Sequence, residues 1–187
     1  MAKSSEVRLI AGRWRGRRLR FPAVSGLRPT PGIVRETLFN WLREAVSGAR
    51  CLDLYAGSGA LGLEAASRGA GEVVQVESHP GVVRHLQATA RQLNAEIRVV
   101  RADVPRFLRR PPDRPFDIVF LDPPFGRGQV APVCQALEQG GWLTATAWIY
   151  VEAEAVLTPA VPSDWTLWRH KRVGEVGCHL YRRQAQA

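Results

Sequence analysis

The sequence predicts an α/β fold with a mostly parallel sheet and helices on both of its faces. Short apolar runs of strand type alternate with amphipathic helical patterns along residues 51–139, and this alternation is typical of parallel sheets. The chain has 187 residues, of which 45% are hydrophobic, so one domain with a sizeable core is expected. The last two predicted strands have no helix between them, which predicts an antiparallel hairpin at one edge.

The elements follow in order along the chain. Residues 8–22 mix arginines with apolar side chains and predict two short strands about Gly12 to Gly16. A loop rich in Pro and Gly covers residues 25–32, and a helix with one apolar face follows from Ile33 as far as Gly48. The later predicted strands are 51–55, 72–77, 97–100, 116–122, 147–154, 165–173 and 178–183, and the later helices are 60–69, 80–94, 104–110 and 129–139, the last with Pro132 in its first turn.

The positive charge is concentrated near the N-terminus. Residues 1–50 hold 11 Lys or Arg against 3 acids, whereas the remaining 137 residues hold 15 against 14. This asymmetry predicts a polyanionic partner for a basic arm at residues 1–30, although a solvated charged face would also explain it. The candidate RNA-binding residues are Arg13, Trp14, Arg15, Arg17, Arg18, Arg20 and Arg28.

Other features exclude several classes of protein. No apolar run approaches the roughly 18–20 residues of a membrane span, and the start lacks the apolar stretch of a signal peptide. The three cysteines are far apart and odd in number, which predicts buried thiols in a reducing cytoplasm rather than a metal site or disulfides. We therefore expect a cytoplasmic monomer with no membrane contact and no metal.

Acidic residues end four of the predicted strands, at Asp53, Glu77, Asp103 and Asp122. The carboxyl ends of parallel strands meet at one edge of a sheet, where ligands bind in such folds. Each acid could instead cap a helix separately. Four carboxylates on one edge would repel a pyrophosphate, so they favour a ligand with a ribose, an adenine and a positive centre, as in S-adenosylmethionine.

A glycine turn follows the first of these strands. Gly57, Gly59 and Gly62 match the spacing G-x-G-x-x-G between a strand and a helix, and Glu77 lies about 20 residues further on, where a ribose diol is usually held. Such a turn lets the backbone approach a ligand closely. Alone the motif is weak, because a tight turn without a ligand can have the same spacing.

The segments "DLYAGSGALGLEA" (53–65) and "LDPPF" (121–125), with Glu77 and Asp103, resemble the class I S-adenosylmethionine-dependent methyltransferases. "RLIAGRWRGRRLRFP" and "LRPTPGIVRETLFNWL" look like the N-terminal signature of the bacterial methyltransferases that act on N2 of a guanine in 16S rRNA. The resemblance implies a Rossmann-like, seven-stranded methyltransferase domain at residues 31–187. It also implies 16S rRNA as substrate, within an assembled or assembling small ribosomal subunit.

The resemblance also implies a role for each matching residue. Asp53, Gly57, Ser58 and Gly59 would line the methionine end of the cofactor, and Tyr55 would also contact the cofactor. Glu77 would hold the ribose hydroxyls, and Ala102 and Asp103 would meet the adenine. Asp122, Pro123, Pro124 and Phe125 would receive the target base, with Asp122 also close to the cofactor. Two departures from the family pattern, at His79 and in the loop 29–32, leave the contacts of those residues open.

The segment "DPPF" suits methylation of an amino group. Asp122 can accept one N–H of the amine, a carbonyl of the Pro123–Pro124 segment can accept the other, and the rigid prolines fix both acceptors in advance. Phe125 can stack on an extruded base.

Alternative functions remain open at this point. They are an adenine-N6 DNA or RNA methyltransferase, a glutamine-N5 protein methyltransferase, a nucleotide-dependent dehydrogenase, and a non-catalytic RNA-binding assembly factor with a vestigial pocket. We expect the pair Arg35–Glu36 to be a surface feature. We interpret Trp142, Trp148, Trp165 and Trp168 as core or hairpin packing.

Overall fold

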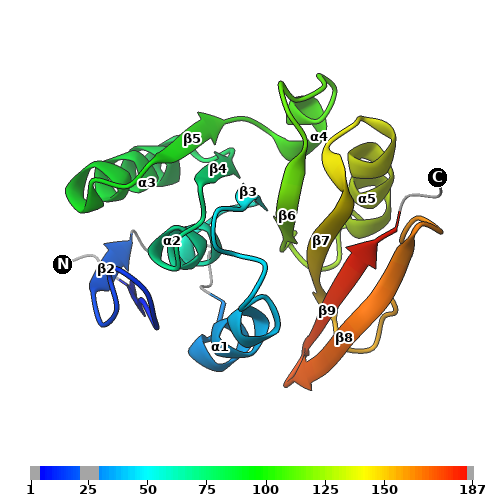
Figure 1. The fold of residues 1–187 in the computed structure, drawn as a ribbon, viewed down its shortest axis with the longest axis horizontal. Coiled ribbons are helices and arrows are strands. Elements are labelled where there is room, and N and C mark those ends of the chain that lie inside the picture. Colours follow the sequence, from blue (N-terminus) through cyan, green and yellow to red (C-terminus); the bar gives the residue numbers. More distant parts are fainter. Residues whose placement is uncertain (1–4, 22–29, 185–187) are drawn as a thin grey trace.

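A seven-stranded sheet forms the centre of the molecule, with strand order β5-β4-β3-β6-β7-β9-β8 (Figure 1). The computed structural model describes residues 5–21 and 30–184. The strands are β3 (Arg50–Leu54), β4 (Glu72–Glu77), β5 (Ile97–Arg101), β6 (Phe116–Leu121), β7 (Leu143–Glu154), β8 (Trp165–Val173) and β9 (Val176–Arg183). Within the group β3 to β7, every pair of neighbouring strands is parallel. Strand β9 is antiparallel to both β7 and β8. The predicted parallel sheet and edge hairpin are therefore confirmed.

Helices cover both faces of the sheet, as the alternating pattern predicts. Helices α1 (Gly32–Trp41) and α2 (Ala60–Ser67) pack with β3, β6, β7 and β9 in one apolar cluster. Helix α3 (Pro80–Leu93) joins α2 on this face, where Leu93 and Leu63 share a cluster. Helices α4 (Val104–Phe107) and α5 (Val130–Gln139) pack in a separate cluster on the other face. Pro132 lies in the first turn of α5, as predicted.

Several element boundaries differ from the prediction, and two of them differ by four residues or more. The apolar pattern of the first helix runs on to Ala45, but α1 ends at Trp41 and the chain continues in tight turns as far as Gly48. Leu42 and Val46 remain buried there, so the pattern reflects burial and not helix. Strand β7 begins four residues earlier than predicted, because Leu143 pairs with Phe116 across an irregularity in the β6–β7 register.

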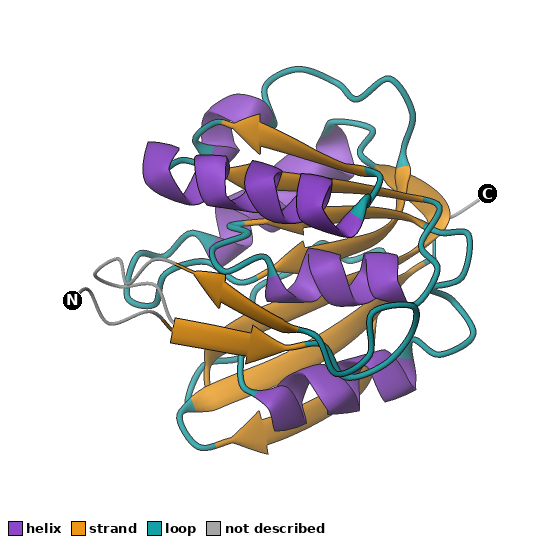
Figure 2. Cartoon of the chain, turned by 90° about the vertical axis from the view of Figure 1, so that its left-hand side faces the viewer, coloured by secondary structure: helices purple, strands orange, loops and turns teal. Residues whose placement is uncertain are grey.

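A small second sheet lies outside the main one. Strands β1 (Ser5–Arg8) and β2 (Arg18–Phe21) pair antiparallel and correspond to the two short strands predicted near the N-terminus. Figure 2 shows this pair in front of the main sheet and separate from it.

The core contains most of the expected apolar residues. All three cysteines are buried, as predicted. Trp142 and Trp165 are buried. Trp168 is 47% exposed and packs edge-on against Trp148, so of the two interpretations, core or hairpin packing, the second applies to Trp168. Trp168 is exposed because β8 is the edge strand of the sheet. Within the described ranges, no helix is both long and apolar enough to cross a membrane.

Candidate active site at the carboxyl ends of the strands

The glycine turn between β3 and α2 is tightly packed against neighbouring elements. Gly57 and Gly59 have φ angles of 53° and 77°, in the left-handed region that favours glycine. A Cβ on Gly59 would lie 2.5 Å from Leu86 of α3. A Cβ on Gly62 would lie 2.9 Å from Asp53 Oδ2. The glycines are therefore required to bring the start of α2 close to α3 and β3.

Asp53 is buried below this turn. Its Oδ2 accepts hydrogen bonds from the Gly62 N–H and from Gln75 Nε2, both at 3.0 Å. Burial raises the pKa of Asp53 to about 7, the hydrogen bonds from Gln75 and Gly62 oppose the rise, and the charges of Asp122 and Glu77 add to it. The charges of Asp122 and Glu77 therefore reach Asp53, which shows that three of the four predicted acids lie near one another.

Glu77 joins the glycine turn to the ends of β4 and β5. Its Oε2 accepts a hydrogen bond from the Gly57 N–H at 3.0 Å, and its Oε1 accepts one from the His79 N–H at 2.8 Å. The Ala102 N–H donates to the Glu77 carbonyl at 3.1 Å. His79 caps α3, because its Nδ1 accepts from the N–H groups of Gly81 and Val82. The sequence left the contacts of His79 open, and the structure shows that it caps the N-terminus of α3.

Asp103 and Tyr55 lie close enough to interact electrostatically. Asp103 is exposed at the start of α4 and makes no capping hydrogen bond with its side chain. The Tyr55 hydroxyl is buried without a hydrogen-bond partner among the described residues. Burial raises the pKa of Tyr55 to about 12, and the charge of Asp103 contributes. Tyr55 also has a φ of 60°, which is uncommon for a residue with a side chain.

The Asp-Pro-Pro-Phe segment directly follows β6. Asp122 is half-buried, Pro123 is buried, and Pro124 is exposed. Burial raises the pKa of Asp122 to about 6. Phe125 is 44% exposed. The next residue, Gly126, donates its N–H to Glu154 Oε1 at 2.6 Å, which ties this loop to the end of β7.

Glu152 is a site residue that the sequence reasoning missed. It is 3% exposed, and its Oε1 accepts a hydrogen bond from the Tyr150 hydroxyl at 3.0 Å. Burial raises the pKa of Glu152 to about 8, and the charges of Asp122 and Asp53 add to the rise. Leu121 pairs with Val151, so the next residues along β6 and β7 are Asp122 and Glu152. The available signal was an acid inside the apolar run "WIYVEAE".

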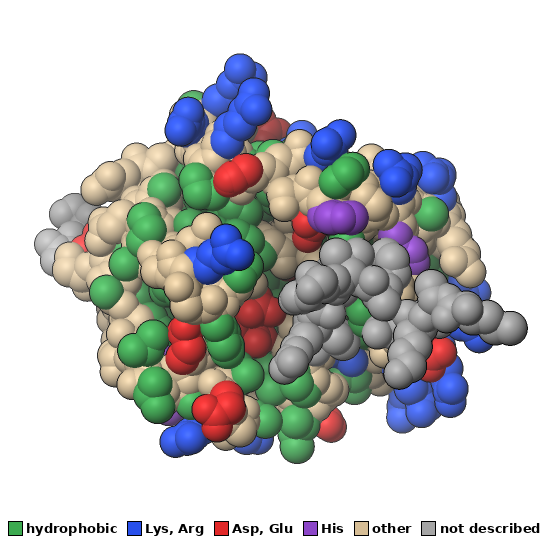
Figure 3. All heavy atoms as spheres, turned by 180° about the vertical axis from the view of Figure 1, so that it is seen from behind, with side chains coloured by type: hydrophobic (Ala, Val, Ile, Leu, Met, Phe, Trp, Pro, Cys, Tyr) green, Lys and Arg blue, Asp and Glu red, His purple; other side chains and the backbone are tan. Residues whose placement is uncertain are grey.

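The charges of the site fit a ligand with a positive centre. Among the described residues, the ion pairs include none of Asp53, Glu77, Asp103, Asp122 and Glu152. Figure 3 shows one face of the molecule, with several acidic side chains near its middle and most Lys and Arg side chains toward its edges. Uncompensated carboxylates favour a sulfonium and an ammonium over a pyrophosphate. The unpartnered Tyr55 hydroxyl can take a further polar contact. The residues present therefore fit S-adenosylmethionine.

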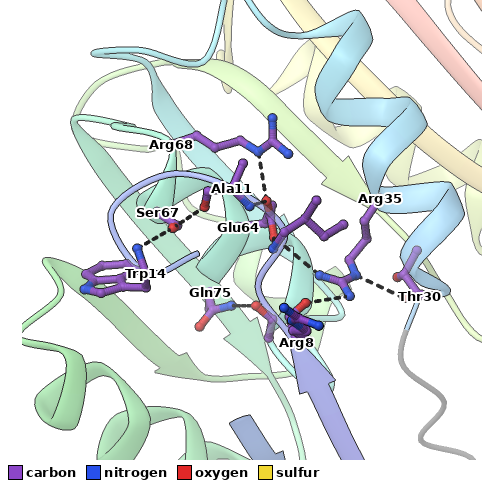
Figure 4. Close-up of polar contacts among 11 residues, drawn as sticks. Arg8, Ala11, Trp14, Thr30, Arg35, Glu64, Ser67, Arg68 and Gln75 are labelled. Carbon is purple, nitrogen blue, oxygen red and sulfur yellow. Dashed lines mark hydrogen bonds and ion pairs between the residues drawn. The ribbon is translucent and has the colours of Figure 1, made fainter. Parts of the chain in front are cut away.

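The basic arm is bound to the body by a buried polar cluster (Figure 4). Glu64 of α2 is fully buried and accepts hydrogen bonds from the Ile10 and Ala11 N–H groups at 2.9 and 3.0 Å. Arg35 Nη1 lies 3.4 Å from the same carboxylate, and Arg68 Nε lies 2.9 Å from it. The arm is therefore packed against the main domain over residues 5–21.

The sequence-based expectation that Arg35 is a surface residue is wrong. Arg35 is 4% exposed, and its Nε and Nη2 donate to the carbonyls of Thr30 and Arg8. Trp14, a candidate RNA-binding residue, is 9% exposed and packs with Leu19 and other apolar side chains. Both are buried because β1–β2 packs against α2, a contact that the local sequence does not reveal.

The arginines of the arm differ from Trp14 in exposure. Arg13, Arg15, Arg17, Arg18 and Arg20 are all exposed. Arg18 forms a surface ion pair with Glu6 at 3.4 Å, which is worth little in water. Arg28 lies outside the described residues, as does the start of the loop 29–32.

Comparison with known proteins agrees with this architecture. The chain is 46% identical over 185 residues to the Escherichia coli ribosomal RNA small subunit methyltransferase D, with 98% of this chain and 93% of the relative covered. It is 42% identical over 180 residues to the Haemophilus influenzae protein of the same name, with 94% and 93% covered. The solved structure of the Escherichia coli protein yhhF superposes with a TM-score of 0.89 at 46% identity, covering 97% of this chain and all of the other.

The parallel sheet with its antiparallel hairpin, the glycine turn and the carboxylate edge define a class I S-adenosylmethionine-dependent methyltransferase. Within that class, the family model described as Conserved hypothetical protein 95 matches residues 7–182. The chain belongs to this family.

Proposed function

We propose that this chain transfers a methyl group from S-adenosylmethionine to the exocyclic N2 of a guanine in small-subunit (16S) rRNA. The relatives described above are named as small-subunit rRNA methyltransferases, which supports the substrate class. The observation that carries the chemistry is the half-buried Asp122, followed by two prolines and the exposed ring of Phe125. This combination offers a hydrogen-bond acceptor and a stacking surface to an extruded base.

S-adenosylmethionine supplies an electrophilic methyl group when it is bound. The exocyclic amine of guanine is a poor nucleophile, because its lone pair is delocalised into the ring. Asp122 accepts one N–H of this amine, and a carbonyl of the Pro123–Pro124 segment accepts the other, so that the lone pair is directed away from the ring plane. Fixed acceptors need little reorganisation during the reaction, and good orientation can supply effective molarities of ~10⁵ M or more.

Glu152 influences the protonation of Asp122. Burial raises the pKa of both carboxylates, and the charge of Asp122 adds to the rise at Glu152, so the pair resists carrying two negative charges at once. The ionised form of Asp122 can accept an N–H. Methylation makes the nitrogen acidic, so one of its two protons passes readily to Asp122 or to water, and Asp122 does not need to be a strong base.

The cofactor contacts follow from the same arrangement. Gly57, Ser58 and Gly59, with Asp53 below them and Tyr55 beside them, would hold the methionine end. Glu77 would accept hydrogen bonds from the ribose hydroxyls, and Ala102 with Asp103 would meet the adenine. The exposed arginines of the arm would bind phosphates, which predicts affinity that falls as salt rises. We further propose that the protein acts in the cytoplasm as a monomer on a partly or fully assembled small subunit.

The test is methyl transfer from radiolabelled S-adenosylmethionine to small subunits that lack their own methylation, beside free 16S rRNA and duplex DNA. We expect label on the rRNA as N2-methylguanosine. Label as N6-methyladenine, or on protein glutamine, would support the alternative methyltransferases and contradict this proposal. A preference for subunits over free rRNA would support the assembled substrate.

The variant Asp122→Ala separates an enzyme from a non-catalytic assembly factor. We expect methyl transfer to collapse while affinity for rRNA stays unchanged, because the acceptor for the amine is lost. The matched control is Glu96→Ala, which removes an exposed acid just before β5, at the opposite end of the strands. Equal effects of Asp122→Ala and Glu96→Ala would contradict the role of Asp122.

A further inference from the structure

The β8–β9 hairpin carries an exposed tryptophan beside arginines, and this ring packs against the half-buried Trp148 of β7. Trp168 lies on the edge strand β8, and its ring meets that of Trp148 edge-on, with centroids 5.8 Å apart. The Arg169 guanidinium lies 5.1 Å from the Trp168 ring, and the Arg182 guanidinium lies 5.1 Å from the Trp148 ring. Together with Lys171, these residues are called the hairpin surface below.

The hairpin surface lies on the α1 face of the sheet. Across β9, Lys171 aligns with Glu152 and Arg169 aligns with Tyr150. Residues aligned across strands point to the same face, and Tyr150 packs in the cluster that α1 covers. Lys171 Nζ also donates to Thr37 Oγ1 of α1 at 3.1 Å. Lys171 therefore lies about 10 Å from Glu152, across two strand spacings, and Trp168, which packs on Trp148, lies further toward the amino end of β7.

The hairpin is also strongly basic. Residues 165–183 hold five Lys or Arg and a single acid, Glu175. Of the five, Arg183 is engaged by Glu138, whereas Arg169, Lys171 and Arg172 are exposed on β8. Charges on an edge strand also prevent strand pairing between molecules. That protection does not require a half-exposed tryptophan between the charges, so it does not explain Trp168.

The hairpin surface and the basic arm flank the same helix. Figure 1 shows β2 on one side of α1 and the β8–β9 hairpin on the other. A cationic surface with aromatic rings is suited to single-stranded nucleic acid, because phosphates contact the cations and bases stack on the rings. We infer that the hairpin surface is a second RNA-binding site, which stacks a base on Trp168 and binds phosphates through Arg169 and Lys171, close to the nucleotide that is methylated. This inference rests on the proposed function.

The first test is RNA affinity of Trp168→Ala, measured with a small-subunit rRNA fragment that the wild type methylates. We expect affinity to fall about 5- to 100-fold, the range for loss of one stacked base. The matched control is Leu167→Ala. Leu167 is 50% exposed but aligns with Tyr181, which packs on the α5 face, so it points away from the hairpin surface. An affinity of Trp168→Ala within twofold of Leu167→Ala would overturn the inference.

The second test removes charge. We expect the double variant R169Q/K171Q to lower the slope of log affinity against log salt by about 1.5, since each lost phosphate contact removes about 0.7–0.9. The control R109Q/R110Q removes two exposed arginines beyond α4, on the other face, and should keep the wild-type slope. Equal slopes for both double variants would overturn the inference.

Further readouts separate this inference from the proposed function and from self-association. The hairpin variants should keep the wild-type melting temperature and affinity for S-adenosylmethionine, which shows that the fold and the cofactor site are intact. If the wild type binds rRNA through this surface but forms no N2-methylguanosine, the proposed function fails and the second site stands. If sedimentation shows a wild-type dimer that Trp168→Ala dissociates without a change in RNA affinity, the surface joins two copies and the inference is wrong.

Discussion

Replacement of Arg35 tests whether the buried polar cluster holds the basic arm on the domain. Arg35→Met removes the charge that faces the fully buried Glu64 and leaves the carbonyls of Thr30 and Arg8 without their guanidinium donors. Breaking a buried ion pair costs about 3–5 kcal/mol. Glu64 keeps Arg68 and two backbone N–H groups, so we expect the lower end, about 3 kcal/mol of unfolding free energy.

The assay is denaturant unfolding beside thermal unfolding. For a chain of this size, 3 kcal/mol corresponds to a fall in melting temperature of about 6–12 °C. The matched control is Arg43→Met, which makes the same change at an exposed position just after α1 and should cost less than about 0.5 kcal/mol. Adding Glu64→Gln to Arg35→Met should lower stability further, because the carboxylate still pairs with Arg68 and accepts hydrogen bonds from the Ile10 and Ala11 N–H groups. A cost below about 1 kcal/mol for Arg35→Met would refute the reasoning.

Three further predictions concern the site and the arm. A carboxylate whose pKa is higher in the folded state stabilises the fold most at a pH below its unfolded-state pKa, and this contribution is lost as the pH rises. Glu152→Gln should therefore lessen the fall in unfolding free energy between pH ~5 and ~8 by about 1 kcal/mol per pH unit. An unchanged dependence of the unfolding free energy on pH, measured by denaturant unfolding, would contradict this. Gly59→Ala should lower stability by about 1–3 kcal/mol and weaken calorimetric binding of S-adenosylmethionine, whereas Gly126→Ala, with a similar φ but open space around it, should have the smaller effect on both. Trp14→Ala should lower the unfolding free energy by about 3–5 kcal/mol, because the ring is buried. Arg17→Gln, at an exposed position, should leave stability unchanged and reduce the slope of log RNA affinity against log salt by about 0.8. If Trp14→Ala lost RNA affinity without losing stability, the Trp14 ring would contact RNA instead of the core.

Much of the fold and part of the site could be predicted from local sequence. The alternation of strand and helix patterns is a local property, and it correctly predicted the parallel sheet, the hairpin and the course of β4 and β8 along the chain. Parallel strands bring their carboxyl ends to one edge, so acids after successive strands could be expected to meet there. The couplings of Asp53 with Asp122 and Glu77 agree with that expectation.

Burial and partners were decided only by the tertiary structure. Trp14, Arg35 and Glu64 lie in segments whose sequence is compatible with an exposed basic arm or a surface helix, and they are buried because β1–β2 packs on α2. Glu152 became part of the site because the β6–β7 register places it beside Asp122. Sequence patterns report periodicity along one chain segment, whereas the pKa, exposure and partners of a side chain depend on which distant segment lies opposite it.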